Sequence, residues 1–118
     1  MKTVVIYHNP RCSKSREALR LLQDAPVAVE IVEYLKTPPE RATLERILDL
    51  LGGEPGALVR AKDPAFAAAG YGPENLSGRE AVVNLLLAHP ALMERPIVVV
   101  GSRAVIGRPP ERVSALIS

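Results

Sequence analysis

The residues best suited to chemistry gather in one short segment, Tyr7-His8-Asn9-Pro10-Arg11-Cys12-Ser13-Lys14-Ser15-Arg16. Cys12 is the only cysteine of the 118 residues. It stands where a β-branched run has ended and a helical pattern begins. Backbone N–H groups at a helix start are unpaired and favour negative charge, so they stabilise the thiolate, which is the nucleophilic form of cysteine. Arg11, Lys14 and Arg16 add positive potential. We therefore predict that Cys12 is a nucleophile.

The single cysteine limits this chemistry. No internal disulfide and no cysteine-based metal cluster can form, and we expect no metal. Ser15 replaces the second cysteine of a Cys-x-x-Cys dithiol. The protein therefore cannot resolve a covalent Cys12 intermediate by itself and needs a thiol from another molecule. Ala18 stands where a Cys-x5-Arg phosphatase loop would carry arginine. The helix start is itself an anion site, so the nucleophile and an oxyanion substrate can share one pocket, with further ligands from distant sequence.

Three arginines are candidates for those distant ligands: Arg60, Arg95 and Arg108. Arginine recognises oxyanions through paired hydrogen bonds, and arginine outnumbers lysine eleven to four in this chain. A high-GC codon bias also explains that ratio. Spacing alone favours each of the three as an anion ligand only slightly more than it favours an ordinary surface arginine.

Hydrophobic patterning predicts the elements that must position these residues. In chain order they are a strand at 3–7, a helix at 13–24, a strand at 27–33, a helix opened by 37–40 and ended by glycines 52–53, short helical pieces over 54–72, a helix after a capping box at 77–80, a hairpin of 96–100 and 104–106, and a last helix from 109.

This order predicts an α/β fold of one domain, residues 1–118. The first β-α-β unit requires parallel strands with a right-handed crossover. A C-terminal β-hairpin added to that unit gives a four-stranded mixed sheet flanked by helices, with a helical insertion before the hairpin. That is a thioredoxin-like topology. In such folds a proline at the position of Pro96 is often cis and faces the active-site cysteine.

Composition excludes several function classes. A net charge of +2 and an aromatic content of 3% argue against nucleic-acid binding. No apolar run reaches the length of a membrane span, and the N-terminus enters a strand rather than a signal peptide. We therefore expect a cytoplasmic protein without a bound cofactor. No strong apolar patch is visible in the sequence, which favours a monomer.

Four separated segments resemble the glutaredoxin-dependent arsenate reductases. The segment 7–16 resembles their catalytic loop, and Leu58-Val59-Arg60 matches in position and context. Arg95-Pro96-Ile97-Val98-Val99 resembles their cis-proline strand, and Ile106-Gly107-Arg108-Pro109-Pro110-Glu111 their final motif. The likeness covers essentially the whole chain, and the Arg-Cys-Ser-Lys-Ser loop together with the short C-terminus resembles most closely a short subgroup of the family.

The resemblance implies a mechanism. Arg60, Arg95 and Arg108 would hold arsenate or a similar oxyanion while the Cys12 thiolate displaces an oxygen to form a thiol–arsenate adduct. Glutathione, as co-substrate, would reduce the arsenic, and glutaredoxin would take the mixed disulfide. Arsenic(V) accepts sulfur readily whereas phosphorus(V) does not, so the choice between arsenate and phosphate would rest on reactivity.

The resemblance also implies roles around the cysteine. Ser15 would donate a hydrogen bond to the thiolate, and His8, when protonated, would add positive charge that favours it. A turn histidine hydrogen-bonded to backbone is an equally good interpretation of His8. Asn9 would shape the loop, with Arg16 and Pro96 as supporting residues.

Two other functions stay open. Relatives of this fold act as redox-responsive transcription regulators that bind RNA polymerase, but those usually carry the Cys-x-x-Cys switch that Ser15 removes here. A thiol reductase acting on another oxyanion or on a glutathione mixed disulfide is the second alternative. The three matching arginines favour the arsenate reductase over the regulator.

Overall fold

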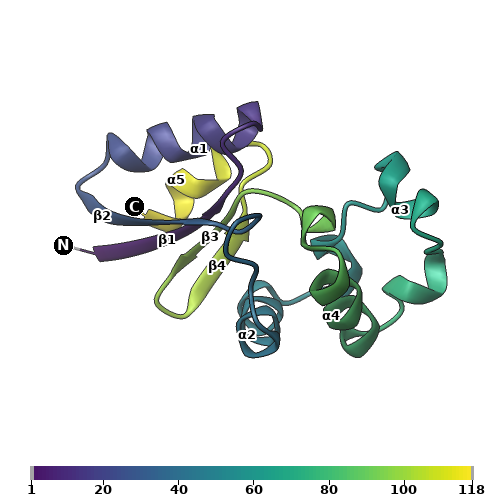
Figure 1. The fold of residues 1–118 in the computed structure, drawn as a ribbon. Helices are drawn as coiled ribbons and strands as arrows, with labels where there is room; N and C mark the ends of the chain where they lie inside the picture. The colour runs from purple at the N-terminus through teal and green to yellow at the C-terminus, as the bar shows by residue number, and fades with distance from the viewer. Residues whose placement is uncertain (1, 118) are drawn as a thin grey trace. The chain divides into compact units, whose positions relative to one another are not determined.

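A computed structural model describes residues 2–117 of the protein (Figure 1). The strands are β1 (Lys2–His8), β2 (Val27–Glu33), β3 (Ile97–Val100) and β4 (Arg103–Ile106). The α-helices are α1 (Ser13–Gln23), α2 (Arg41–Leu51), α3 (Pro64–Ala68), α4 (Arg79–Ala88) and α5 (Arg112–Ile117). Short 3-10 helices are η1 (Pro55–Leu58), η2 (Pro73–Leu76) and η3 (Pro90–Leu92). Every predicted helix and strand is present, within one to three residues of its expected bounds.

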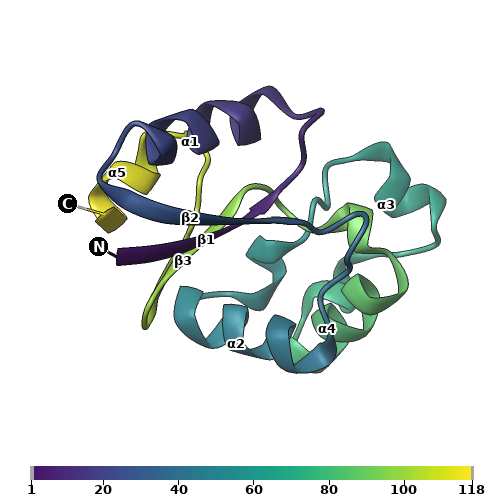
Figure 2. The same ribbon diagram turned by 60° about the vertical axis from the view of Figure 1, so that its left-hand side comes forward.

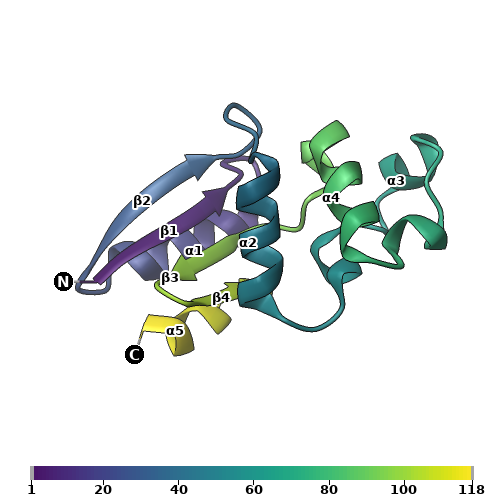
Figure 3. The same cartoon turned by 90° about the horizontal axis from the view of Figure 1, so that it is seen from below.

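The chain forms two compact units. The first consists of Met1–Thr37 and Arg95–Ser118, and the second of Pro38–Glu94. The first unit holds the whole sheet, whose strand order is β2-β1-β3-β4. β1 pairs with β2 in parallel and with β3 antiparallel, and β4 pairs antiparallel with β3 (Figure 3). This is the thioredoxin-like mixed sheet that the sequence predicts, and the second unit is the helical insertion before the hairpin.

Helices α1 and α5 lie side by side on one face of this sheet (Figures 1 and 2). The alternation of side chains along β1 turns its buried residues toward that face. The core between the sheet and the two helices consists of Val4, Ile6, Ala18, Leu22, Val98, Val113 and Leu116. His8 follows in the same alternation and is also buried. The strand that contributes Val4 and Ile6 to the core therefore also places the His8 side chain beneath the start of α1.

The second unit is built from short helices, with α4 in contact with α2 and with all three 3-10 helices. The buried side chains of α2 are Leu44, Ile47 and Leu48, as its helical spacing predicts. Gly52, at a φ of 66°, ends that helix in a conformation that glycine adopts without strain.

The capping box expected at 77–80 is wrong. The N-cap of α4 is Gly78, and the Ser77 hydroxyl donates to the carbonyl of Glu74 in the preceding 3-10 helix. Ser77 is thus used to close one helix rather than to open the next. None of the helices within residues 2–117 is long and apolar enough to cross a membrane.

Candidate active site

The loop between β1 and α1 holds Cys12 at the N-cap of the helix, in extended conformation with φ −95° and ψ 121°. Its backbone N–H donates to the carbonyl of Asn9 at 3.0 Å, and its carbonyl accepts the N–H of Arg16 at 3.0 Å. The Asn9 side-chain oxygen accepts the N–H of Arg11, and the Arg16 guanidinium donates to the carbonyl of Pro10. These bonds fix the loop on both sides of a half-buried thiol.

A buried polar pair lies beneath this loop. His8 is 5% exposed and Ser15 is fully buried, and the His8 Nδ1 and Ser15 Oγ atoms are 2.6 Å apart. The Ser15 hydroxyl also accepts the backbone N–H of Asn9 at 3.1 Å. Because buried polar groups are costly without partners, the pair ties the end of β1 to the first turn of α1 and holds the loop between them.

The Cys12 thiol is more acidic than an ordinary cysteine. Burial is the largest single effect and opposes ionisation, but the backbone N–H of Ser15, the charge of Arg95, the N–H of Lys14 and a side-chain hydrogen bond from Arg95 outweigh it and hold the pKa of Cys12 below its usual value. The side chain makes no capping hydrogen bond of full geometry in α1. The effect therefore comes from several weak donors acting together at the helix start.

Two of the predicted arginines belong to the same unit as Cys12 and lie at its thiol. The Arg108 Nη1 atom is 3.7 Å from the Cys12 sulfur and 3.4 Å from the carbonyl oxygen of Arg95. Arg95 acts on the thiol through its charge and a hydrogen bond. The Arg95–Pro96 bond is cis, as expected for this fold, and so is the Arg108–Pro109 bond. Two cationic side chains thus converge on one sulfur.

Gly107 allows the Arg108 segment to approach Pro96, and sequence reasoning missed its importance. The Gly107 N–H donates to the Pro96 carbonyl at 2.8 Å. A Cβ at this position would lie 2.9 Å from the Pro96 Cγ atom and 3.2 Å from a Val113 methyl. Glycine is therefore required by close packing, and it stands directly before Arg108. The signal in the sequence was a glycine between a strand and an arginine, which patterning alone does not distinguish from a turn.

Arg60, the third predicted arginine, belongs to the second unit. Its Nη2 atom forms an ion pair with the Asp63 carboxylate at 2.6 Å, and its Nη1 atom donates to the carbonyl of Ala91 at 3.3 Å. Part of its charge is therefore neutralised by a carboxylate three positions further along the chain. Its role as an oxyanion ligand stays a prediction.

The positive charge expected of His8 is not supported. Burial lowers the pKa of His8 below its ordinary value, Glu33 raises it through its charge, and Arg16 lowers it further. The imidazole is thus mainly neutral at neutral pH. The expected backbone-bonded turn histidine is not found either, because the partner of the ring is the Ser15 hydroxyl.

The hydrogen bond expected from Ser15 to the thiolate comes from the backbone of Ser15, not from its side chain. The hydroxyl is engaged by His8 and Asn9, and it is the backbone N–H of Ser15 that favours the Cys12 thiolate. The sequence identifies Ser15 as important but cannot tell which of its polar groups faces the sulfur.

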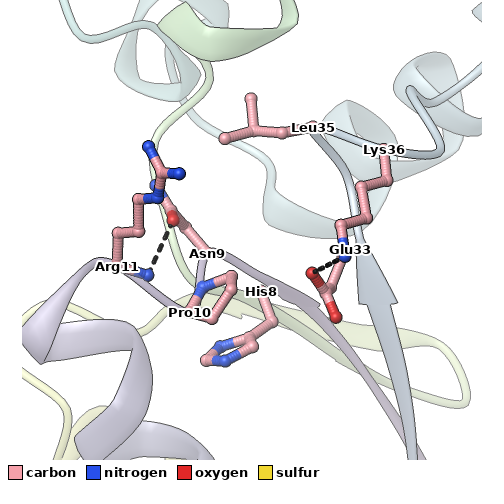
Figure 4. A pocket seen from close by; sticks show the side chains of 7 residues that line it. All are labelled: His8, Asn9, Pro10, Arg11, Glu33, Leu35 and Lys36. Carbon is pink, nitrogen blue, oxygen red and sulfur yellow. Dashed lines mark hydrogen bonds and ion pairs between the residues drawn. The ribbon is translucent and has the colours of Figure 1, made fainter.

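A pocket of about 270 Å³ opens beside this loop (Figure 4). One wall comes from the end of β1 and the loop that follows, and the other from the end of β2 and its turn. Its lining residues are His8, Asn9, Pro10, Arg11, Glu33, Leu35 and Lys36. Within residues 2–117, no group of three His, Cys, Asp or Glu side chains is placed to hold a metal ion.

Comparison with known proteins decides the family. A family model described as the ArsC family matches residues 7–116, which include the whole Cys12 loop and both Arg95 and Arg108. The chain belongs to the ArsC family. An arsenate reductase of Neisseria meningitidis is 42% identical over 118 residues, covering 99% of this chain and 100% of that protein. The uncharacterized protein YfgD of Escherichia coli is 46% identical over 117 residues, covering 98% of each chain.

A solved ArsC-family structure supports the fold. The arsenate reductase from Vibrio cholerae superposes with a TM-score of 0.89 at 41% identity, covering 99% of this chain and 98% of that one. The likeness therefore extends over both compact units and over every segment that the sequence resemblance used.

Proposed function

We propose that this protein is an arsenate reductase in which Cys12 is the nucleophile and glutathione and glutaredoxin supply the reducing equivalents. The observation that carries the proposal is the convergence of Arg95 and Arg108 on an acidified thiol at a helix start. Arsenate carries negative charge at neutral pH, and two guanidinium groups together with unpaired backbone N–H groups are suited to hold it. The full-length likeness to the meningococcal arsenate reductase supports the choice of substrate.

The reaction follows from these residues in three steps. The Cys12 thiolate attacks arsenic(V), forming an S–As bond as one oxygen leaves as water. The sulfur of glutathione then bonds to the Cys12 sulfur, the S–As bond breaks, and its electron pair stays on arsenic, which leaves as arsenite. Glutaredoxin finally attacks the mixed disulfide, takes the glutathione and returns Cys12 to the thiolate.

Each residue has a defined task in this scheme. Arg95 and Arg108 neutralise the oxyanion and lower the barrier to attack by an anionic thiolate. His8 and Ser15 hold the loop so that the helix N–H groups face the sulfur. The reaction needs a reducing compartment, so we assign the protein to the cytoplasm.

The test is arsenate reduction by the purified protein with glutathione and glutaredoxin, followed by NADPH consumption through glutathione reductase. Cys12→Ser is the blank. Arsenate-dependent turnover that is absent from the blank is the expected result. No turnover with arsenate, but formation of a glutathione mixed disulfide on Cys12, would refute arsenate reduction and direct the search to another oxyanion or mixed-disulfide substrate.

A further inference from the structure

The Arg108 guanidinium keeps donors available beside the Cys12 sulfur. Its Nη1 atom lies 3.7 Å from the sulfur and 3.4 Å from the carbonyl oxygen of Arg95. Within residues 2–117, no protein group accepts a hydrogen bond from its Nη2 or Nε atom. Because the nitrogen atoms of a guanidinium form a rigid planar fork, the Nη2 atom stays close to the sulfur. An atom bonded to the one that the sulfur attacks therefore meets a charged donor.

The other groups that act on the thiol also donate hydrogen bonds or carry positive charge. The backbone N–H groups of Ser15 and Lys14 and the charge of Arg95 all favour a negative sulfur. The Ser15 hydroxyl is engaged by His8 and by the N–H of Asn9. Within residues 2–117, no carboxylate is among the groups that perturb the thiol. The surroundings therefore favour a reaction in which negative charge moves from the sulfur to a departing atom nearby.

Displacement at an oxygen–oxygen bond is the simplest reaction of this kind. A thiolate attacks one oxygen of a hydroperoxide, and the second oxygen leaves with the bonding electron pair as hydroxide or alkoxide. The leaving oxygen is one bond away from the oxygen under attack, so it lies within reach of the Arg108 donors. Cys12 is half-buried, so a molecule as small as hydrogen peroxide has access to the sulfur.

We propose that Cys12, with Arg108 as the donor to the leaving oxygen, also reduces hydroperoxides. In the first step the sulfur forms a bond to one peroxide oxygen, the oxygen–oxygen bond breaks, and Cys12 becomes a sulfenic acid. The second oxygen takes the bonding electron pair and then a proton from solvent, so hydrogen peroxide gives water and an organic hydroperoxide gives an alcohol. The sulfur is thereby oxidised and the peroxide reduced.

Turnover needs a thiol from another molecule, because Cys12 is the only cysteine of the chain. Glutathione attacks the sulfenic acid, its sulfur bonds to the Cys12 sulfur, and the oxygen leaves as water. The product is the same mixed disulfide that glutaredoxin resolves in the arsenate scheme. This second step rests on the proposed function, which supplies the reductant, whereas the first step requires only Cys12 and Arg108.

The first step is tested without any added thiol. The reduced protein is mixed with hydrogen peroxide at about pH 9.5, well above the free-thiol pKa of about 8.5, so that Cys12 is ionised in every variant. Dimedone traps the sulfenic acid, and mass spectrometry of the Cys12 peptide gives the rate constant. N-acetylcysteine, corrected for its thiolate fraction, is the reference. A thiolate of lower pKa is intrinsically the weaker nucleophile, so a rate constant at least about tenfold above the reference, which we expect, measures the effect of the surrounding donors.

Variants of Arg108 connect that rate constant to the geometry. Arg108→Ala should lower it about tenfold to a hundredfold, the usual size for the loss of a charge-assisted hydrogen bond. Arg108→Lys keeps the charge but not the paired N–H groups, so it should lose most of the same advantage. Arg103→Ala removes an exposed arginine of the β-hairpin in the same unit and should leave the rate constant unchanged. Thermal unfolding shows which variants are folded, and the lysine variant decides where alanine disturbs the fold.

The proposal is overturned by a Cys12 rate constant at or below the reference, by Arg108 variants that keep the wild-type rate, or by an equal loss in the Arg103 control. A sulfenic acid that glutathione does not convert into the mixed disulfide would overturn the second step. Rapid, Arg108-dependent oxidation in a protein that does not reduce arsenate would refute the proposed function and support the peroxide inference. Arsenate turnover by a Cys12 that oxidises no faster than N-acetylcysteine would do the opposite.

Discussion

Arg108 and Arg60 are both arginines, but their guanidinium groups have different neighbours. In the first unit, the Arg108 guanidinium faces a carbonyl oxygen and the sulfur of Cys12, and within residues 2–117 it forms no ion pair with a carboxylate. In the second unit, Arg60 pairs with Asp63 at 2.6 Å. A guanidinium beside a thiol keeps its charge for an incoming anion, whereas one beside a carboxylate has already been neutralised.

The comparison teaches that residue type and motif position do not by themselves define an anion ligand. Arg60 and Arg108 both match segments of the arsenate reductase pattern, yet Arg108 contacts the nucleophile of its own compact unit, whereas Arg60 belongs to the other unit and pairs with Asp63. We therefore expect the chemistry to depend on the first unit far more steeply than on Arg60, and five experiments test that difference.

The largest effect is expected from Cys12→Ser. A hydroxyl at this position stays protonated and is a poor nucleophile, so arsenate turnover should fall by at least about a thousandfold. Thermal unfolding should change little, because the thiol is half-buried and makes no capping bond. Activity near the wild-type level would mean that the first unit does not carry the reaction.

Removing the arginines should give the next largest effect. Arg95→Ala and Arg108→Ala should each lower kcat/KM about tenfold to a hundredfold, since a charge-assisted hydrogen bond contributes about 1.5–3 kcal/mol. Arg60→Ala should cost less, because Asp63 already neutralises part of its charge. Steady-state kinetics with all three variants rank the losses in kcat/KM. A loss for Arg60→Ala equal to that for Arg108→Ala would show that the two arginines do not differ in their contribution to the reaction.

Asp63→Asn sharpens that test. It leaves Arg60 in place but removes the carboxylate that pairs with it. If Arg60 serves the oxyanion, the KM for arsenate should fall in this variant. An unchanged KM would assign Arg60 to the packing of the second unit alone.

Gly107→Ala should give a smaller effect that again separates the two units. The added methyl has to displace Pro96 or Val113, so we expect a loss of about 1–3 kcal/mol in the free energy of unfolding. The shift of Arg108 should also lower kcat/KM and raise the pKa of Cys12. Gly78→Ala is the matched control, because nothing lies within 4 Å of its Cβ position and its φ is not positive. Equal losses in both variants would show that Gly107 has no positioning role.

The smallest expected effect is on the pH dependence of the Cys12 thiol. The pKa of Cys12 is depressed in the folded protein, so the thiolate contributes stability above the free-thiol value of about 8.5, and this contribution is lost as pH falls through the folded pKa. The iodoacetamide reaction rate should reach half its maximum below pH 8.5. Arg95→Ala should move this midpoint upward, whereas Arg60→Ala should leave it in place. A wild-type midpoint at the free-thiol value would count against an activated nucleophile.

Local sequence determined the elements of this protein and the position of its nucleophile. A β-branched run predicts β1, alternation predicts β2, helical spacing predicts α1, α2 and α4, and a polar cationic loop before a helix start marks Cys12. These signals are readable because they depend on residues a few positions apart. The one local prediction that failed, the capping box at Ser77, did so because a neighbouring 3-10 helix used the same hydroxyl.

Only the tertiary structure decided which groups meet the thiol. Arg108 reaches Cys12 across 96 positions of the chain, and that contact exists because β3 and β4 pair beside β1. The same packing buries His8 against Ser15, which keeps the imidazole neutral and turns the serine backbone, not its hydroxyl, toward the sulfur. Charge state and hydrogen-bond direction depend on burial and on residues that are distant in the chain, so the spacing of neighbouring residues does not predict them.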